Sequence, residues 1–314
     1  MVHEVPYLCV LNIHSFKSDM ERKLFLKLAT GGIIMTGINS FSSLKQFTDQ
    51  LEEQEQLMPV VFVGHGSPMN GIENNPFSQR WTKLAQEIPT PKAVLVVSAH
   101  WFTKGTMITE MDFPPTIHDF GGFPQALFDV QYPAPGNPAL ARETASMIHT
   151  TKVELSHDWG LDHGTWSIVR HMYPKADIPV LQLSIDYTKD AQYHYQLAKE
   201  IYALRKKGVL IMGSGNMVHN LRMVAWDKLN EPEYGFDWAI YMNNKFKELI
   251  SNGQHDSLIQ YQQLGKEALM AIPTPEHYLP LIYTLALKGE KDQIEFFNDK
   301  AVGGSLTMTS VKFG

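Results

Sequence analysis

The chain is 314 residues long and carries a formal net charge of -6, with a sequence pI of about 6.1. Hydrophobic residues make up 44% of it, which is enough for a sizeable core in one domain or two. Because basic residues are not in excess, we expect no nucleic-acid partner, and a small molecule is the better candidate. The single cysteine, Cys9, excludes an intramolecular disulfide and a multi-cysteine metal site, so metal chemistry would depend on histidine.

Residues 1–58 have the composition of a leader followed by a linker. Residues 20–41 combine a basic start, an apolar stretch and small or polar residues, and Arg22-Lys23-Leu24-Phe25-Leu26-Lys27 is similar to a twin-arginine export signal with lysine as its second basic residue. The apolar stretch is too short to span a bilayer, so we expect no stable membrane insertion. An amphipathic helix on a cytoplasmic protein explains residues 20–41 equally well, which leaves both a periplasmic and a cytoplasmic location open. Residues 43–58 are polar and helix-prone, as in a linker or a peripheral helix.

From residue 59 onward, short apolar runs alternate with longer amphipathic stretches. The apolar runs predict strands at Val60–Val63, Ala93–Ser98, Pro179–Ser184 and Val209–Met212. Strands that are apolar on both faces belong in the middle of a sheet that helices cover. We therefore predict a single α/β domain over residues 59–314, with a mostly parallel or mixed central sheet and helices on both faces.

The amphipathic stretches predict helices, several of which have a proline and an N-cap candidate at their start. They are Phe77–Ile88, Ala139–His149, Ala191–Lys207, Asp237–Ser251 and Glu276–Lys288. The Pro- and Gly-rich segments 112–137 and 156–164 are too long for simple connections, which makes them candidate walls of a site.

Three histidines follow predicted strands: His65 in VVFVGH, His100 in VLVVSAH and His219 in VLIMGSGNMVH. In open α/β sheets, ligands bind outside the carboxyl ends of the strands. One histidine in such a place is usually an ordinary hydrogen-bonded loop residue. Three in parallel positions of one sheet favour a shared site.

Two further histidines are candidates for this site. His277 is predicted in the first turn of the last helix, and His163 in a glycine-containing loop that could approach a ligand closely. Either residue alone is more often structural. Imidazole nitrogen suits zinc, iron, copper or nickel, and three protein ligands with open positions are typical of a catalytic metal site.

Two other kinds of site are disfavoured by the local sequence. Gly64-His65-Gly66-Ser67-Pro68 differs from the G-x-S-x-G nucleophile elbow of hydrolases, because histidine follows the first glycine. Gly213-Ser214-Gly215-Asn216 is not the G-x-G-x-x-G dinucleotide motif, and no acidic residue follows at the expected spacing. A nucleotide cofactor is therefore not expected.

Seven short motifs occur in order between residue 59 and the C-terminus. They are Gly64-His65-Gly66-Ser67-Pro68-Met69-Asn70, Ser98-Ala99-His100-Trp101, Asp119-Phe120-Gly121-Gly122-Phe123-Pro124, Tyr132-Pro133-Ala134-Pro135-Gly136, Leu161-Asp162-His163-Gly164-Thr165-Trp166, Gly213-Ser214-Gly215-Asn216 with His219-Asn220-Leu221, and Pro275-Glu276-His277-Tyr278-Leu279-Pro280-Leu281. In content and order they resemble the DOPA 4,5-dioxygenase family of the class III extradiol ring-cleaving superfamily. The resemblance is more specific for the family than for the substrate.

The resemblance implies one divalent metal ion in a mononuclear non-haem iron(II) centre, and zinc is also found in members of the family. Matched position by position, His65, His100 and His277 would bind the metal, and His219 and His163 would be acid/base residues beside it. The usual non-haem iron site has two histidines and one carboxylate, so Glu276 is the alternative third ligand. His277 is preferred because it matches the family motif.

The implied reaction opens a catechol ring with O2, by 4,5-cleavage of L-DOPA or a related substrate to a seco-DOPA semialdehyde. His219, with a pKa near neutrality, would take a proton from a catechol hydroxyl and later return one, and His163 would stabilise oxygen. Iron(II) would support turnover. Zinc bound in the isolated protein would hold the geometry without redox chemistry.

Residues beside these motifs are candidates for the walls of the substrate pocket. They are the aromatic residues Trp101, Phe120, Phe123 and Trp166, and His118 and Asp119 for contact with the amino-acid end of the substrate. An ordinary place in the core explains any one of the aromatic residues equally well.

Two alternatives remain open from the sequence. The same histidines could hold zinc in a hydrolase that uses a metal-activated water, or the chain could be a non-catalytic binding member of the superfamily. Oxygen uptake would distinguish the first alternative, and the presence of His163 and His219 beside the predicted ligands argues against the second. The sequence does not determine the oligomeric state.

Overall fold

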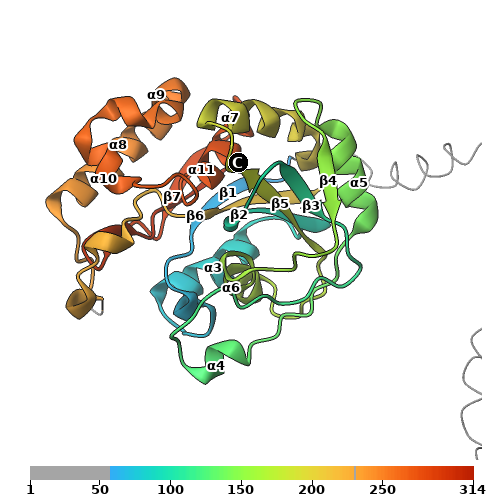
Figure 1. Cartoon of the computed structure of the whole chain (residues 1–314), viewed down its shortest axis with the longest axis horizontal. Helices are drawn as coiled ribbons and strands as arrows, with labels where there is room; N and C mark the ends of the chain where they lie inside the picture. The colour runs from blue at the N-terminus through green and yellow to red at the C-terminus, as the bar shows by residue number, and fades with distance from the viewer. Residues whose placement is uncertain (1–56, 230) are drawn as a thin grey trace, which may run out of the picture. The chain divides into compact units, whose positions relative to one another are not determined.

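The computed structural model describes residues 57–229 and 231–314 (Figure 1). The predicted leader, including the export-like segment at residues 20–41, and nearly all of the predicted linker lie outside the described residues. Within the described part of the chain, no helix has the length and apolar character needed to cross a membrane.

The core of the fold is an eight-stranded mixed sheet with the strand order β4-β3-β5-β2-β6-β1-β10-β7. Its strands are β1 (Val60–Gly64), β2 (Ala93–Thr103), β3 (Thr106–Thr109), β4 (Val153–Ser156), β5 (Val180–Asp186), β6 (Val209–Gly215), β7 (Ile294–Phe297) and β10 (Ser310–Phe313). The four strands predicted from the sequence are β1, β2, β5 and β6, and they form the parallel centre of the sheet. The antiparallel pairs of β3 with β5, β1 with β10 and β10 with β7 make the sheet mixed, as predicted.

The strands at the two edges, β3 and β4 on one side and β10 and β7 on the other, were not predicted. Each has only four residues, which is too short to show a clear alternation of apolar and polar side chains. A separate two-stranded sheet, β8 (Ala301–Val302) with β9 (Leu306–Thr307), is shorter still. Contacts across the sheet, rather than local pattern, define these strands.

Helices cover both faces of the sheet, which confirms the predicted α/β architecture. They are α3 (Pro76–Glu87), α4 (Gln125–Phe128), α5 (Pro138–Met147), α6 (His163–Met172), α7 (Ala191–Glu200), α8 (Asp237–Ser251), α9 (His255–Ile259), α10 (Lys266–Ala271) and α11 (Leu279–Ala286), with 3-10 turns η1 (Pro68–Gly71), η2 (Tyr202–Arg205), η3 (Leu221–Met223), η4 (Trp226–Lys228) and η5 (Tyr261–Leu264). In Figure 1, α3 and α6 lie on one side of the sheet, and α7 and α11 lie on the other.

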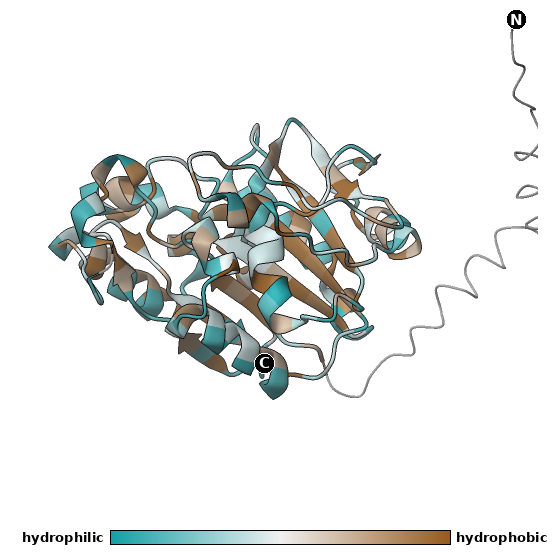
Figure 2. Ribbon diagram, turned by 90° about the horizontal axis from the view of Figure 1, so that it is seen from below, coloured by the Kyte–Doolittle hydropathy of each residue, from teal (hydrophilic) through white to brown (hydrophobic). Residues whose placement is uncertain are grey.

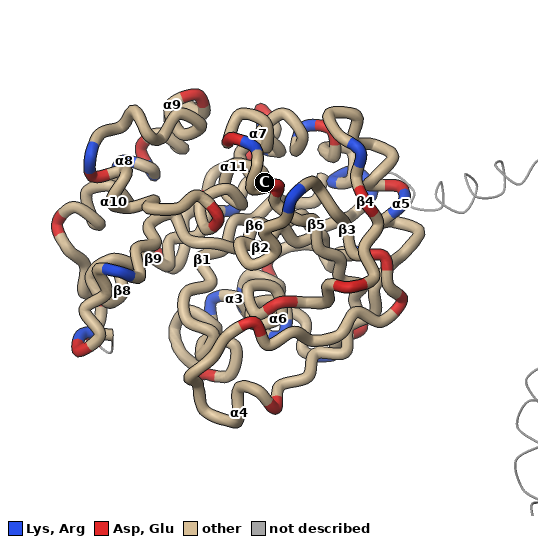
Figure 3. The backbone as a smooth tube through the Cα atoms, viewed as in Figure 1, with Lys and Arg blue, Asp and Glu red and all other residues tan. Residues whose placement is uncertain are grey.

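Alternate side chains of each central strand enter two separate hydrophobic cores. In β1, Val60 and Phe62 join the core under α7, α8 and α11, whereas Val61 and Val63 join the core that contains residues of α3 and α6. Figure 2 shows the strands as a brown, hydrophobic layer between helices of mixed colour. In Figure 3, most Lys, Arg, Asp and Glu residues lie on the outer helices and loops rather than on the central strands.

The last predicted helix, Glu276–Lys288, was placed too early, because α11 begins at Leu279. Proline lacks a backbone N–H and its ring clashes with the carbonyl four residues earlier, so Pro280 is compatible only with the first turn of a helix. His277 therefore lies in the turn that precedes α11, not in its first turn.

The segment 156–164, predicted as a loop, ends inside a helix that was not predicted. His163 is the first residue of α6, and the Asp162 side chain accepts a hydrogen bond from the backbone N–H of Thr165 at 3.1 Å as its N-cap. Gly164 and the β-branched residues of α6 weaken the helical signal. The predicted helix Ala191–Lys207 also differs, because α7 ends at Glu200 and the chain continues as the 3-10 turn η2.

We expect His194 to make the stability of the fold fall with acidification. Its ring is fully buried between the Tyr283 hydroxyl at 2.9 Å and the Asp186 carbonyl at 3.2 Å, and burial lowers the pKa of His194 from 6.5 to about 4. Below pH 6.5 the unfolded chain binds a proton that the folded chain binds only near pH 4, so stability decreases over this window. Between pH 7.5 and pH 5 this linkage amounts to about 2 kcal/mol.

The measurement is urea unfolding of the wild-type protein and of His194→Gln at both pH values. Other buried histidines contribute equally to both proteins, so the difference isolates His194. We expect the free energy of unfolding of the wild-type protein, relative to that of His194→Gln, to be lower by about 2 kcal/mol at pH 5 than at pH 7.5. An advantage that is the same at both pH values would contradict this account.

Candidate metal centre

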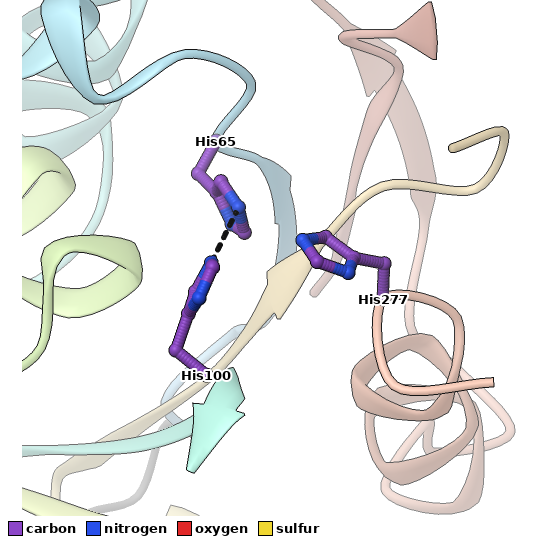
Figure 4. Close-up of side chains that lie close together, drawn as sticks. All are labelled: His65, His100 and His277. Carbon is purple, nitrogen blue, oxygen red and sulfur yellow. Dashed lines mark hydrogen bonds between the residues drawn. The ribbon is translucent and has the colours of Figure 1, made fainter. Parts of the chain in front are cut away.

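Three histidines from distant parts of the chain surround one point at the edge of the sheet. One ring nitrogen of each of His65, His100 and His277 lies within 4.8 Å of those of the other two. The ring centroids are 5.0 Å (His65 to His100), 5.3 Å (His65 to His277) and 5.2 Å (His100 to His277) apart, so the three rings form a nearly equilateral triangle. Figure 4 shows the three side chains pointing toward one another from separate elements.

The parallel register of the central strands brings His65 and His100 to the same edge. Gly64 of β1 pairs with Gly215 of β6, and Ser98 of β2 pairs with Ser214 of β6. The histidines that follow these residues therefore emerge side by side, as the position of ligand sites in α/β sheets predicts.

Glycine at the end of β6 lets the turn that carries His277 approach the sheet. A Cβ atom on Gly215 would lie 2.1 Å from the carbonyl oxygen of His277, so no side chain fits there. The backbone N–H of Asn216 donates to that same carbonyl at 2.9 Å. The glycines around Ser214 thus serve close backbone packing, which explains why they lack the dinucleotide-binding pattern.

Hydrogen-bond partners determine which nitrogen of His65 carries the proton. The Ser214 hydroxyl donates its hydrogen to the Gly164 carbonyl at 2.5 Å, so the contact of 3.0 Å between His65 Nδ1 and Ser214 Oγ requires Nδ1 of His65 to donate. His65 Nε2 is then left with a lone pair. In His100, Nδ1 faces the Asp119 carboxylate at 3.2 Å, which leaves Nε2 of His100 without a proton in the neutral ring.

These two Nε2 atoms lie only 3.1 Å apart (Figure 4), although neither neutral ring has a proton to place between them. A positive charge is needed there. Burial lowers the pKa of His100, but the hydrogen bond to Asp119 and the charges of Asp162 and Asp119 outweigh burial and raise it. Burial and the neighbouring histidines hold the pKa of His65 well below its ordinary value. The cluster therefore attracts one cation, and its neutral imidazole donors fit a transition metal.

Glu276 lies beside His277 and contacts its ring. The Glu276 carboxylate accepts a hydrogen bond from the Thr274 hydroxyl at 2.8 Å and lies 3.3 Å from Nδ1 of His277. With Nδ1 donating to the carboxylate, Nε2 of His277 keeps its lone pair. A carboxylate that orients a histidine in this way is typical of a metal site.

His219 stacks on His277, with ring centroids 3.6 Å apart and planes inclined by only 9°. A metal ion lies close to the plane of each imidazole that binds it, so a single ion cannot lie in the planes of both rings. Among the described residues, no hydrogen bond to a ring nitrogen of His219 occurs. Burial lowers the pKa of His219 to about 4, which is below the predicted value near neutrality. The ring is therefore uncharged at pH 7 and can accept a proton.

His163 is held by Asp119 at the start of α6. Its Nδ1 lies 2.9 Å from Oδ2 of Asp119, and its backbone N–H donates to Oδ1 of Asp119 at 2.9 Å. The His163 ring lies 3.9 Å from that of His100, centroid to centroid. Burial raises the pKa of Asp119, but the hydrogen bonds from His100 and His163 outweigh it and hold this pKa well below its usual range.

The residues predicted to line the pocket occupy different places. Phe120 lies beside His163, with ring centroids 5.5 Å apart, and His118 lies 5.8 Å from Phe120. Trp166 is fully buried and donates from Nε1 to the carbonyl of Ile117, so it supports the pocket-lining segment and does not line the pocket itself. Trp101 is buried as well, and its ring stacks on that of Trp159.

Two supporting residues, Ser214 and Asp162, were not predicted. The fully buried Asp162 carboxylate accepts hydrogen bonds from Ser98 at 2.8 Å and from Gln182 at 2.6 Å. A signal was available in the sequence, because Ser98, Gln182 and Ser214 are polar residues at or within otherwise apolar strands. Buried polar side chains need partners, so their presence in central strands indicates a polar network.

Residues 58–314 match the family described as the catalytic LigB subunit of aromatic ring-opening dioxygenase. The chain belongs to this family. LigB-family enzymes use a metal ion, and the histidine cluster can bind one. This LigB-family member is therefore an extradiol dioxygenase that acts on an aromatic substrate with O2.

Individual relatives agree with the family assignment. The chain is 46% identical over 261 residues to a 4,5-DOPA dioxygenase extradiol of Escherichia coli K12, covering 82% of this chain and 95% of the relative. It is 32% identical to a 4,5-DOPA dioxygenase extradiol of Beta vulgaris, covering 83% of this chain and 98% of that protein. A crystal structure of an uncharacterized Escherichia coli K12 protein superposes with a TM-score of 0.69 at 38% identity, covering 82% of this chain and all of that one.

We expect Gly164→Ala to weaken metal binding in this LigB-family enzyme. The added Cβ would lie 2.7 Å from Ser98 Oγ and 2.9 Å from a carbon of the His100 ring, so the ring would have to move. Zinc titration of the metal-free protein should show an affinity lower by about tenfold or more. Alanine favours helix over glycine, so the backbone of α6 would not account for the loss.

Gly121→Ala is the matched control, because no atom of residues 57–229 or 231–314 lies within 4 Å of the Cβ that it adds. It should bind zinc as the wild-type protein does. Equal zinc affinity in Gly164→Ala and the wild-type protein would contradict the inferred packing of His100.

Proposed function

We propose that this enzyme opens the ring of L-DOPA, or of a closely related catechol, by 4,5-cleavage to a seco-DOPA semialdehyde. The observation that carries the proposal is the triangle of His65, His100 and His277, whose inward nitrogens keep their lone pairs when the rings are neutral. The names of the relatives from Escherichia coli and Beta vulgaris support the choice of substrate.

Iron(II) is the proposed metal, with His65, His100 and His277 as its ligands and Glu276 as the carboxylate that orients His277. Bound there, iron(II) would supply the redox chemistry that a reaction with O2 requires. Zinc would fit the same three nitrogen donors but has no accessible redox change, so a zinc-loaded protein would hold the geometry without turnover.

His219 is the proposed acid/base residue for the catechol hydroxyl. Its ring is neutral at neutral pH, its nitrogens have no hydrogen-bond partner among the described residues, and stacking on His277 fixes its orientation. A positioned imidazole of this kind contributes about 10²–10⁴-fold to a proton transfer. His163 is the proposed second acid/base residue, because its Nδ1 is tied to Asp119 while Nε2 is left for a reacting partner.

Aromatic side chains on one side of the site suit a flat substrate. Phe120 packs edge-on against His163, and its ring also contacts Phe123 at 5.4 Å and Phe128 at 5.1 Å, centroid to centroid. Such a wall would position a catechol ring through apolar contact and exclude water from the proton-transfer residues.

The decisive experiment is oxygen uptake by the iron-loaded enzyme. The metal-free protein is reconstituted anaerobically with iron(II), mixed with L-DOPA and exposed to air. We expect one O2 consumed per L-DOPA and a yellow semialdehyde product, and no uptake after loading with zinc. Absence of turnover with L-DOPA and with other catechols, despite bound iron, would refute the proposal.

Substitutions should separate metal binding from proton transfer. His65→Ala and His100→Ala should each abolish metal binding, because each removes one of three ligands. His219→Ala should retain one metal ion per chain and lower kcat by about 10²–10⁴-fold. Metal content is measured by atomic emission, and the opposite pattern would overturn the assignment of ligands and acid/base residue.

A further inference from the structure

Asp119 contacts a proposed metal ligand and a proposed acid/base residue with the same oxygen atom. Its Oδ2 lies 2.9 Å from Nδ1 of His163 and 3.2 Å from Nδ1 of His100. Its Oδ1 accepts the backbone N–H of His163 at 2.9 Å. Three contacts of one carboxylate thus reach two elements, β2 and α6.

We propose that Asp119 is a positioning residue that fixes His100 and His163 in one mutual arrangement. The inference rests on the proposed function, because it takes His100 as a metal ligand and His163 as an acid/base residue. It gives Asp119 a part other than the contact with the amino-acid end of the substrate that was predicted from the sequence.

A carboxylate is the group that can make these contacts together. An ionised carboxylate has about four lone-pair sites on two oxygens and can accept from several N–H groups, whereas an amide has one acceptor oxygen and presents an NH2 group in place of the other. The Asp119 side chain is only 14% exposed, so its hydrogen bonds are little weakened by water. Oδ1 also accepts a free N–H at the start of α6, where a negative charge is favourable.

The segment that carries Asp119 is itself fastened to α6 and the residues before it. The backbone N–H of Ile117 donates to the Leu161 carbonyl at 2.7 Å, and the Trp166 indole donates to the Ile117 carbonyl at 2.9 Å. Phe120 packs against His163 on the other side of Asp119. The carboxylate therefore has a rigid support, which a positioning residue needs.

Both oxygens of Asp119 are already engaged in these contacts. A substrate ammonium group would have to compete with His100 and His163 for Oδ2, or with the helix N-terminus for Oδ1. Loss of Asp119 should therefore change the metal site and the rate of turnover more than the apparent affinity for substrate.

The test compares Asp119→Asn, Asp119→Glu and the control Asp112→Asn, which changes an exposed aspartate seven residues earlier. Zinc(II) is titrated into each metal-free full-length protein without substrate. We expect Asp119→Asn to bind zinc about 10- to 100-fold more weakly, Asp119→Glu to lie between it and the wild type, and Asp112→Asn to match the wild type. With saturating iron(II), kcat of Asp119→Asn for L-DOPA should fall by about 10- to 100-fold, with KM changed by less than about threefold.

Each half of the proposal can fail separately. Wild-type zinc affinity in folded Asp119→Asn, checked by circular dichroism, would overturn the link to His100. Unchanged kcat at saturating iron would overturn the link to His163, and a raised KM with unchanged kcat would favour the substrate contact instead.

If Asp119→Asn does not fold, wild-type zinc affinity and kcat in Asp119→Glu would overturn the proposal. If the wild-type enzyme turns over no catechol, the proposed function fails, while the zinc titrations still decide the link to His100.

Discussion

The site depends on one electrostatic constraint: Nε2 of His65 and Nε2 of His100 lie 3.1 Å apart, and when both rings are neutral neither atom carries a proton, so a positive charge is needed beside them. Two neighbouring residues impose this constraint. Ser214 contacts Nδ1 of His65 and Asp119 contacts Nδ1 of His100, and each contact requires that nitrogen to donate. His277 adds a third ring at a similar distance, with Glu276 at its outer nitrogen. Each inward lone pair is thus fixed by a hydrogen bond on the far side of its ring. The arrangement favours a cation that accepts neutral nitrogen donors, which is the property that the family's metal-dependent chemistry requires.

The parallel sheet makes this convergence possible by bringing strand ends to a common edge. His65 follows β1 and His100 lies within the last part of β2, and β6 between these strands supplies Ser214 to support His65. The third ring arrives from the turn before α11, and that turn can contact the sheet only because Gly215 has no side chain. Glycine therefore contributes close approach of two backbones here, rather than a phosphate-binding loop.

Burying this many polar groups costs stability that the apolar core must offset. Asp162 is fully buried, and its oxygens accept hydrogen bonds from Ser98, Gln182 and the backbone of Thr165. A carboxylate satisfied by several donors is far less costly than an unpaired one, and it restrains the elements that supply the donors. Asp162 and Asp119 together fix the start of α6, so the position of His163 depends on two separate carboxylates. Helix α6 is therefore as much a part of the site as the strand ends are.

The sequence by itself determined the central strands, the presence of covering helices and the rim position of His65 and His100, because these follow from local apolar pattern and from the geometry of parallel strands, although helix α6 was not predicted. Its motifs also indicated the family, to which His277 and His163 were assigned by position. Only the tertiary structure decided that His277 precedes α11, that His219 stacks on His277, and that Asp119 faces two histidines. These features join residues from about 20 to 60 positions apart, or restrict a ring's orientation, so no local periodicity encodes them. They exist only once the packed chain has fixed every partner in place.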